Sequence, residues 1–324
     1  INRILIVFCI SVILLSCNSK QQTPIVINLH DNWEFKQVDS SQWHTATVPG
    51  EVHSDLLNNK LIEHPFIGNN EHDLQWVSET HWEYKTQFSL NKNILNRKHI
   101  DLNLEGLDTY AKVYLNDSLI FNTNNAFLNW QKDVKSLLKL ENTLRIVFTK
   151  PSDIEEKEKA KLGYQLPEGN RIFTRKAQFQ YGWDWGPKLN TSGIWKPIKI
   201  VAWDDFKIED VYIKQISLNK QKAVLEVTLE NKIKSNESLN YEFYVNNQLK
   251  KTTSNKNSLL VEIENPTLWW PHNIGDPHLY NFRIDVKKGN TIVDSKSIKY
   301  GIRTIELVTE KDSIGESFYF NVNG

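Results

Sequence analysis

The sequence predicts an all-β protein built from two β-sandwich domains in series. Apolar and polar residues alternate along many short segments, which is the pattern of strands with one buried face. Turn-forming pairs such as Asn116-Asp117 and Asn246-Asn247 separate these segments. The chain has 324 residues, enough for two domains at about 100–200 residues each.

The first domain is expected over residues 18–204, with its clearest strands in the middle of that range. Alternating apolar residues on both sides of Asn116-Asp117 predict a hairpin with one buried face. Residues 152–161 are charged, acidic at the start and basic at the end, which complements the helix dipole and predicts a solvated surface helix. The alternating apolar residues of this domain are Ile100, Leu102, Leu104, Val113, Leu115, Leu119, Phe121, Leu144, Ile146 and Phe148.

A second β domain is expected over residues 205–306. Its strands are short and turn signals follow them closely, a pattern typical of an immunoglobulin-like sandwich. The expected strands run over residues 208–213, 224–228, 241–245, 258–263, 280–286 and 295–306. No internal repeat or low-complexity tract interrupts either domain.

Residues 1–17 are expected to be a lipoprotein signal peptide. Arg3 supplies a positive start, and the apolar run over residues 4–15 matches the ~7–15 residues of a signal-peptide core but not the ~20 that span a bilayer. Leu14-Leu15-Ser16-Cys17 has the form of a bacterial lipobox, in which Cys17 is acylated. We therefore expect a lipid anchor in the bacterial cell envelope, at the periplasmic or surface face of the outer membrane. The alternative is a buried N-terminal strand.

Composition excludes several classes of function. Lys+Arg and Asp+Glu are both 39, so no net positive charge attracts nucleic acid or an anionic membrane surface. The sequence has no glycine-rich phosphate loop, no HExxH motif and no serine nucleophile elbow, and its 9 histidines lack ligand-like spacing. With Cys9 in the signal peptide and Cys17 acylated, the mature chain has neither a disulfide nor a thiol nucleophile. We expect no cofactor, no metal, no nucleic-acid partner and a membrane contact through the lipid alone.

The candidate binding site lies in one segment, Arg175-Lys176-Ala177-Gln178-Phe179-Gln180-Tyr181-Gly182-Trp183-Asp184-Trp185-Gly186-Pro187. If the glycines bend the chain, Asp184 stands beside an indole, a pairing that recognises sugars by stacking and by hydrogen bonds to hydroxyl groups. If the segment is a strand, Trp183 and Trp185 share one face and Asp184 points the other way. Composition alone leaves sugar binding and core packing both open.

This segment and several others resemble the β-mannosidases of glycoside hydrolase family 2, over residues 28–324. The resemblance implies a jelly-roll, galactose-binding-like sandwich, then an immunoglobulin-like sandwich, then a TIM barrel of which residues 307–324 would be the start. The other matching stretches include Val48-Pro49-Gly50-Glu51, Phe66-Ile67-Gly68-Asn69-Asn70-Glu71, Gly106-Leu107-Asp108-Thr109-Tyr110, Gly193-Ile194-Trp195-Lys196, Trp269-Trp270-Pro271-His272 and Tyr300-Gly301-Ile302-Arg303.

The resemblance also implies a reaction, the retaining hydrolysis of terminal β-mannosides. One carboxylic acid protonates the leaving oxygen and a second carboxylate, about 5–5.5 Å away, is the nucleophile. Both glutamates belong to the barrel, so no catalytic residue is assigned to this chain, and the chain alone is expected to be inactive. The expected partners are terminal β-mannoside oligosaccharides and the chain's own missing barrel.

By the same resemblance, Asp184 would accept hydrogen bonds from mannose hydroxyls and Trp183 would form a wall of the site. Arg175 would orient Asp184 through a bidentate ion pair, or would be a strand-edge arginine that faces water. Trp185 is expected in the core. Polar residues of the other matching loops are expected to be structural: His53 and Asp55 as turn caps, and Glu71 as an interdomain or structural carboxylate.

Three functional hypotheses follow. The chain is the N-terminal part of a β-mannosidase, a surface lipoprotein that binds carbohydrate without cleaving it, or a relative that acts on β-galactosides or β-glucuronides. The Trp-Asp-Trp-Gly-Pro block favours the first over the third. The absence of Met, and a C-terminus that stops in a strand followed by a turn signal, favour a truncated enzyme over the second.

Overall fold

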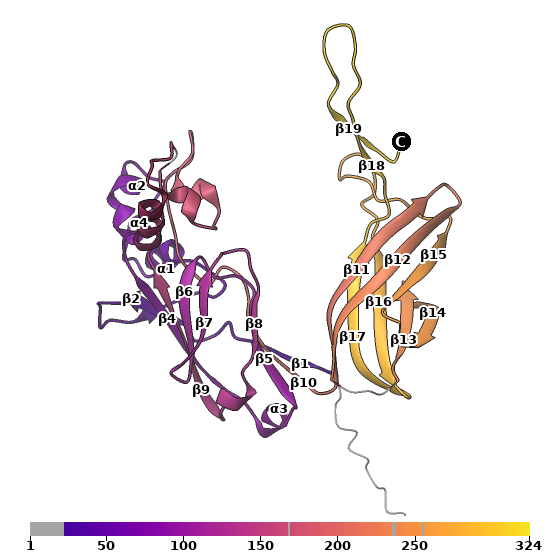
Figure 1. Cartoon of the computed structure of the whole chain (residues 1–324), viewed down its shortest axis with the longest axis horizontal. Helices are drawn as coiled ribbons and strands as arrows, with labels where there is room; N and C mark the ends of the chain where they lie inside the picture. Colours follow the sequence, from indigo (N-terminus) through magenta and orange to yellow (C-terminus); the bar gives the residue numbers. More distant parts are fainter. Residues whose placement is uncertain (1–22, 168, 235–237, 255) are drawn as a thin grey trace, which may run out of the picture.

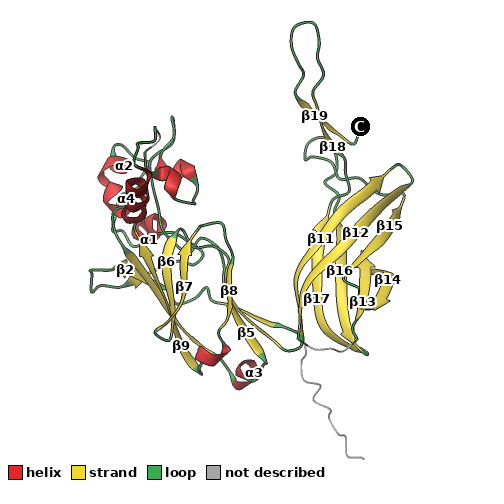
Figure 2. Cartoon of the chain, viewed as in Figure 1, coloured by secondary structure: helices red, strands yellow, loops and turns green. Residues whose placement is uncertain are grey.

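The structure is a computed structural model that describes residues 23–324 except 168, 235–237 and 255 (Figure 1). The expected signal peptide and the acylated Cys17 lie outside the described residues. The described part is dominated by strands and forms two β-sandwiches in series, as the sequence predicts (Figure 2). No helix within it is long and apolar enough to cross a membrane.

The first sandwich packs a six-stranded sheet, β3-β2-β4-β9-β6-β7, against a four-stranded sheet, β1-β10-β5-β8. Neighbouring strands in both sheets are antiparallel. The strands are β1 (Ile25–Asn28), β2 (Glu34–Gln37), β3 (His44–Thr45), β4 (Trp82–Ser89), β5 (His99–Leu104), β6 (Tyr110–Leu115), β7 (Ser118–Asn124), β8 (Trp130–Asp133), β9 (Glu141–Thr149) and β10 (Ile198–Trp203). The first and last strands of this sandwich are paired, so the unit closes on itself.

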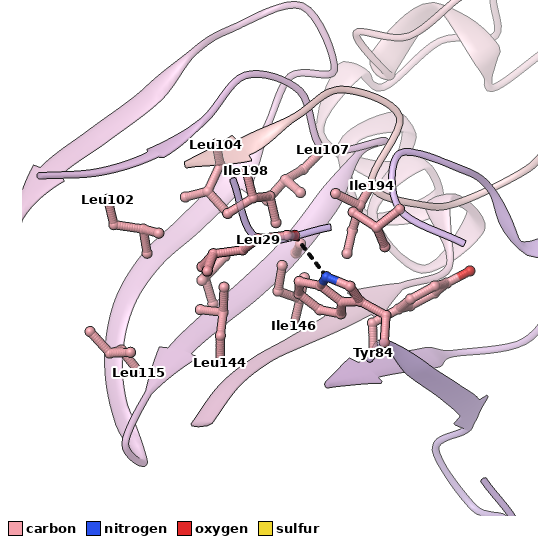
Figure 3. Close-up of a cluster of buried hydrophobic side chains, with 14 of the residues drawn as sticks. Leu29, Tyr84, Leu102, Leu104, Leu107, Leu115, Leu144, Ile146, Ile194 and Ile198 are labelled. Atoms are coloured by element: carbon pink, nitrogen blue, oxygen red, sulfur yellow. Dashed lines mark hydrogen bonds between the residues drawn. The ribbon is translucent and has the colours of Figure 1, made fainter. Parts of the chain in front are cut away.

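The core of this sandwich comes from alternation along its central strands (Figure 3). Trp33 is 1% exposed among these side chains, and its indole nitrogen donates to the Leu29 carbonyl at 2.9 Å. Burial of each large apolar side chain contributes about 1.5–3 kcal/mol. The predicted apolar residues of β5 and β9 are all fully buried, which confirms both strands: Ile100, Leu102, Leu104, Leu144, Ile146 and Phe148.

The predicted hairpin at Asn116-Asp117 is confirmed, because β6 and β7 pair across it and the two turn residues have φ values of 47° and 66°. The prediction for the buried face of β7 is wrong at one residue. A bulge after Val113 shifts the register, so that Leu119 is 48% exposed while Ile120 is buried. One extra residue in a strand exchanges its two faces.

Short helices cover one end of the first sandwich, where Figure 1 labels α1, α2 and α4, while α3 lies at the opposite end. The α- and 3-10 helices of the first sandwich are α1 (Val52–Asn58), α2 (Asn70–Asp73), η1 (Gln75–Val77), α3 (Lys92–Leu95), η2 (Lys135–Leu137), α4 (Pro151–Leu162), η3 (Arg171–Phe173) and η4 (Gln178–Tyr181).

Helix α4 confirms the helix predicted over residues 152–161, and it ends at Gly163, whose φ of 69° is the left-handed conformation of a helix C-cap. The prediction that this helix is fully solvated is wrong at Glu155. That side chain is buried because it accepts hydrogen bonds from Thr174 and Tyr181 on the loop that packs beside the helix.

The second sandwich packs sheet β11-β12-β15 against sheet β14-β13-β16-β17, again with antiparallel neighbours. Its strands are β11 (Phe206–Leu218), β12 (Lys222–Ile233), β13 (Asn240–Val245), β14 (Gln248–Ser254), β15 (Ser258–Glu264), β16 (Tyr280–Lys288) and β17 (Thr291–Tyr300). Tyr241, Phe243 and Val245 are buried in its core, and the predicted turn at Asn246-Asn247 has φ values of 48° and 65°.

The strand predicted over residues 295–306 is wrong in its second half. Strand β17 ends at Tyr300, and β18 (Ile305–Val308) pairs with β19 (Tyr319–Val322) in a separate hairpin. The strand ends next to Gly301, where an added Cβ would stand 2.9 Å from the Trp269 side chain. The backbone packs against this indole instead of continuing the sheet.

The two sandwiches meet where β10 leads into β11 (Figure 1). A buried ion pair bridges them there. Lys207 Nζ of β11 lies 2.8 Å from Asp101 Oδ2 of β5, and the two side chains are 6% and 5% exposed. The same Asp101 oxygen accepts a hydrogen bond from Trp203 Nε1 at 3.0 Å.

Candidate functional site

The segment that carries the candidate site is a bent loop at the helical end of the first sandwich. After η4, Gly182 adopts a φ of 96°, which favours glycine. Trp183 and Gly186 then exchange backbone hydrogen bonds at 3.3 and 3.2 Å, so that Asp184 and Trp185 form the tip of a tight turn. The alternative in which the glycines bend the chain is therefore confirmed, and the alternative of a continuous strand is wrong.

The side chains of this turn face outward. Trp183 is 56% exposed and Trp185 is 86% exposed, and Asp184 is exposed as well. The prediction that Trp185 lies in the core is wrong, because the turn lifts this residue away from both sheets. An exposed pair of indoles beside a carboxylate offers both stacking surface and hydrogen-bond acceptors.

Arg175 does not form the predicted ion pair with Asp184. Its side chain is exposed, as the alternative for this residue has it, while its carbonyl accepts a hydrogen bond from the Ala126 amide at 2.9 Å. The backbone of Arg175 thus belongs to a short bridge with Asn125. The next residue, Lys176, points inward instead.

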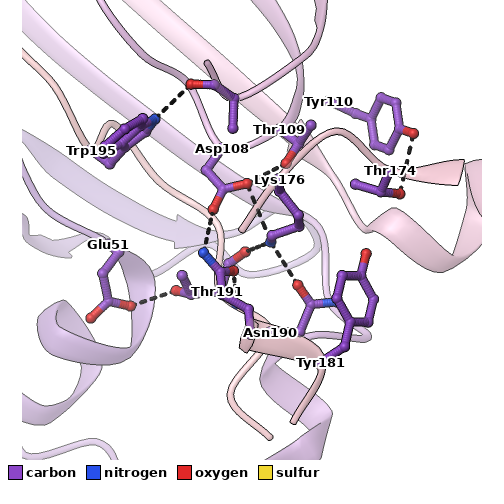
Figure 4. A network of polar contacts seen from close by, with 12 residues as sticks. Glu51, Asp108, Thr109, Tyr110, Thr174, Lys176, Tyr181, Asn190, Thr191 and Trp195 are labelled. Carbon is purple, nitrogen blue, oxygen red and sulfur yellow. Dashed lines mark hydrogen bonds and ion pairs between the residues drawn. The ribbon is translucent and has the colours of Figure 1, made fainter. Parts of the chain in front are cut away.

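The base of the loop is a buried polar network around Lys176 (Figure 4). The Lys176 side chain is 0% exposed, and its Nζ lies 3.3 Å from Asp108 Oδ1. The same nitrogen donates to Asn190 Oδ1 and to the Thr191 carbonyl, each at 2.6 Å. Burial lowers the pKa of Lys176, and the Asp108 carboxylate opposes this shift. The network joins both ends of the loop.

A second carboxylate, Glu51, supports the same region. Its side chain caps α1 by accepting the amide hydrogens of His53 and Ser54, and it also accepts the Thr191 hydroxyl at 2.5 Å. Burial alone would raise the pKa of Glu51, but hydrogen bonds from His53, Ser54 and Thr191 outweigh burial and lower it to about 2. Glu51 is therefore a structural anion that ties α1 to the end of the loop.

The predicted turn-capping roles of His53 and Asp55 are wrong in part. Both lie within α1, and the cap is Glu51. Asp55 accepts the Thr47 amide at 2.8 Å and the Tyr84 hydroxyl at 3.0 Å while only 1% exposed. Burial raises its pKa to about 6, although both hydrogen bonds act against the shift.

The outer flank of the loop is held by α2 and η1. Glu71 Oε1 accepts the Lys188 amide at 2.6 Å, and Gln75 Nε2 donates to the Lys188 carbonyl at 2.8 Å. Glu71 therefore has a structural role, one of the two predicted for it. On the inner flank, the Tyr181 hydroxyl donates to Glu155, and burial followed by this bond raises the pKa of Tyr181.

A polar cleft of about 640 Å³ opens between α4 and the loop. It is lined by Ser78, Glu79, Ser152, Glu155, Glu156, Pro167, Gly169, Asn170, Arg171, Tyr181, Lys188 and Asn190. No group of three His, Cys, Asp or Glu side chains within residues 23–324, the five undescribed positions aside, is placed to hold a metal ion. The polar lining of the cleft offers hydrogen-bond donors and acceptors, and the indoles of the turn offer stacking surface.

These features define a class of architecture: two β-sandwich modules in series, with an aromatic and acidic turn at one end of the first module. The chain belongs to glycoside hydrolase family 2. Residues 33–196 match the galactose-binding domain-like model of glycosyl hydrolase 2, and residues 206–303 match the model of glycosyl hydrolases family 2. The predicted order of a galactose-binding-like and an immunoglobulin-like sandwich is confirmed.

Similar proteins include named β-mannosidases. Beta-mannosidase B of Aspergillus oryzae is 33% identical over 91% of this chain, which spans 37% of that relative's length. The crystal structure of a β-D-mannosidase from Dictyoglomus thermophilum is 35% identical, with a TM-score of 0.83 over 92% of this chain and 39% of its own. A β-glucuronidase from Bifidobacterium dentium, at 16% identity and a TM-score of 0.65 over 93% of this chain and 50% of its own, shares the fold.

The sequence did not reveal the residues that hold the turn in place. Lys176 and Asp108 are far apart along the chain, and no local pattern pairs them. The sequence linked these two residues only in that each lies in a segment that resembles the same family.

Proposed function

We propose that this chain is the N-terminal accessory part of a retaining, exo-acting β-mannosidase that hydrolyses terminal β-D-mannosides. The observation that carries the proposal is the turn that presents Asp184 between two exposed indoles. The similarity to β-mannosidases at 33% and 35% identity supports mannose as the sugar. The two catalytic carboxylates would come from a barrel beyond these residues.

In this proposal the turn contributes binding rather than bond cleavage. Asp184 accepts hydrogen bonds from mannose hydroxyls, each worth about 1.5–3 kcal/mol because the acceptor is charged. The face of Trp183 packs on the C–H face of the ring. Arg175 is exposed near the base of the loop and is available to bind a further hydroxyl.

We further propose that residues 1–17 direct the protein to the bacterial envelope, where lipid on Cys17 anchors it to the outer membrane. The apolar run and the Cys that follows it support this proposal. Labelled palmitate should be incorporated into the expressed protein and should be absent from a Cys17→Ala variant. Equal labelling of the two proteins would exclude Cys17 as the anchor.

The binding role is tested by saturation-transfer NMR on residues 18–324 with methyl β-D-mannopyranoside, the β-galactoside and the β-glucuronide. The mannoside should give the strongest transfer, and Asp184→Ala should abolish it, whereas Asp39→Ala, which removes another exposed carboxylate, should not. Equal transfer in wild type and Asp184→Ala would exclude Asp184 as the sugar ligand.

The catalytic part is tested by reading the gene past the codon for Gly324. An open frame with glutamates at barrel strand ends is expected, and its product should hydrolyse p-nitrophenyl β-D-mannopyranoside. The 324-residue chain alone should show no turnover above a boiled control. A stop codon directly after the codon for Gly324 would leave a protein that binds carbohydrate without cleaving it.

A further inference from the structure

The loop over residues 177–189 carries the Trp183–Gly186 turn but adds no strand to either sheet, although every one of its residues is described. Its internal backbone hydrogen bonds close single turns, such as those from the Gly182 amide to Phe179 and from the Trp183 amide to Gly186. Such short-range bonds do not fix the direction in which a loop points. The orientation of the turn must come from side-chain contacts.

Lys176 supplies these contacts at the point where the loop begins and ends. It precedes the loop directly, while two of its three acceptors, Asn190 Oδ1 and the Thr191 carbonyl, follow the loop directly. The third acceptor is Asp108 Oδ1, which lies in the connection between β5 and β6. An ammonium group has three donors, so the geometry satisfies the buried charge completely.

Gln180 extends this network into the loop itself. Its Nε2 donates to Asp108 Oδ2 at 2.9 Å, and its Oε1 accepts the Thr191 amide at 3.3 Å. Asp108 in turn is fixed to the sandwich, because its backbone exchanges two hydrogen bonds with Gly193 at 2.9 and 3.0 Å. Contacts therefore run from Gly193 to Asp108, and from Asp108 both to Lys176 and, through Gln180, into η4.

We propose that Lys176 is the positioning residue of the mannoside-binding turn: its buried ammonium closes the loop over residues 177–189 and orients Trp183 and Asp184 before substrate arrives. The inference rests on the proposed function and identifies how that site is held. Preorganisation of this kind lowers the entropy lost when a sugar binds. The contacts of Glu71 and Gln75 to Lys188 hold the outer flank. At the base, Lys176 is the buried cation that contacts both Asp108 and the residues that follow the loop, and Gln180 adds neutral hydrogen bonds to the same partners.

Hydrogen–deuterium exchange of the purified chain tests the proposal. In Lys176→Met, the amides of Gln180, Gly182, Trp183 and Gly186 should exchange at least about tenfold faster, since removing one partner of a buried pair opens the structure that depends on it. The matched control is Lys199→Met, which removes a lysine whose side chain is 30% exposed and which pairs with Glu105 on the same sandwich. The control should leave these amides unchanged.

A second variant, Asn190→Ala, keeps the test decisive if Lys176→Met does not fold. It keeps the Lys176–Asp108 pair and removes one acceptor, so the loop amides should exchange severalfold faster while amides of β5 and β6 keep their protection. Unchanged loop amides in both variants would overturn the proposal. Equal acceleration of loop and strand amides in Asn190→Ala would also overturn it, because Lys176 would then serve general stability.

Mannoside binding by the same samples separates the two proposals. If the wild-type chain shows no saturation transfer to methyl β-D-mannopyranoside, the proposed function fails while the exchange result still decides the role of Lys176. If the wild type binds and Asn190→Ala binds more weakly, the turn needs its base to recognise the sugar. If Asn190→Ala exchanges faster yet binds equally well, positioning for the sugar is refuted.

Discussion

Replacing Lys207 with methionine tests how firmly the two sandwiches are joined. Lys207 and Asp101 belong to different sandwiches, their charged atoms lie 2.8 Å apart, and neither side chain is more than 6% exposed. Methionine has a similar length and no charge, so the variant leaves the Asp101 carboxylate buried with only neutral donors. Trp203 and Gln131 still donate to it, at 3.0 and 2.9 Å.

Removing one partner of a buried ion pair costs about 3–5 kcal/mol, because the remaining charge has lost both solvent and counter-ion. Lys207 also lies 2.9 Å from Glu209, whose side chain is 27% exposed, so Lys207 is not the partner of Asp101 alone. We therefore expect the low end of this range, about 3 kcal/mol of unfolding free energy. Lys98→Met at the same junction should cost less than about 1 kcal/mol, because Lys98 is 61% exposed in its pair with Asp205.

Urea unfolding followed by circular dichroism and tryptophan fluorescence measures both values. The double variant Asp101→Asn/Lys207→Met removes the uncompensated charge and should recover part of the loss. A cost in Lys207→Met no larger than in Lys98→Met would refute the reasoning. A double variant less stable than Lys207→Met would show that lost packing, and not a buried charge, sets the cost.

Three further variants test other parts of the structure by the same urea titration. Asp55→Asn should change the pH dependence of stability, because burial raises the pKa of Asp55 from 3.8 to about 6. Between these values the folded state holds a proton that the unfolded state releases, so wild type should lose about 3 kcal/mol of unfolding free energy relative to the variant as pH rises from about 4 to above 6. Parallel pH profiles of the two proteins would contradict this. Trp185→Ala should lower the unfolding free energy by less than about 0.5 kcal/mol, whereas Trp33→Ala, at a buried position, should lower it by about 3–5 kcal/mol. Equal losses in the two variants would show that Trp185 is buried. Gly301→Ala should cost about 1–3 kcal/mol because its Cβ would stand 2.9 Å from Trp269, and an unchanged midpoint would show that the indole can move.

The strands of both cores were predictable from the sequence because burial on one face of a sheet is a local, period-two property. Ile100, Leu102 and Leu104 each carry that signal without help from the rest of the chain. The failures came where a second segment decides the outcome. The bulge at Ile120, next to Leu119, arises in the pairing of β7 with β6, and β17 ends beside Gly301, which packs against the distant Trp269.

The candidate site was predictable only in part, for a related reason. The glycines around Trp183 and Asp184 made a bent loop one of two alternatives that the sequence left open, and the family followed from several matching segments. The predicted ion pair between Arg175 and Asp184 does not form, because the chain turns sharply between them and their side chains point in different directions. Lys176, the next residue after Arg175 in the sequence, does form a buried ion pair, and only the structure shows that its partner is Asp108.

The error over Trp185 shows why composition misplaces exposed tryptophans. An indole that stays exposed contributes little of its apolar surface to folding. The loop that displays it therefore needs another source of order, and here that source is polar: a buried ammonium with three acceptors below a turn whose indoles are 56% and 86% exposed. Hydrophobicity predicts the reverse arrangement, with the lysine outside and the tryptophan inside. The exposed tryptophan of the loop and the buried lysine at its base are therefore the two residues that hydrophobicity alone places wrongly.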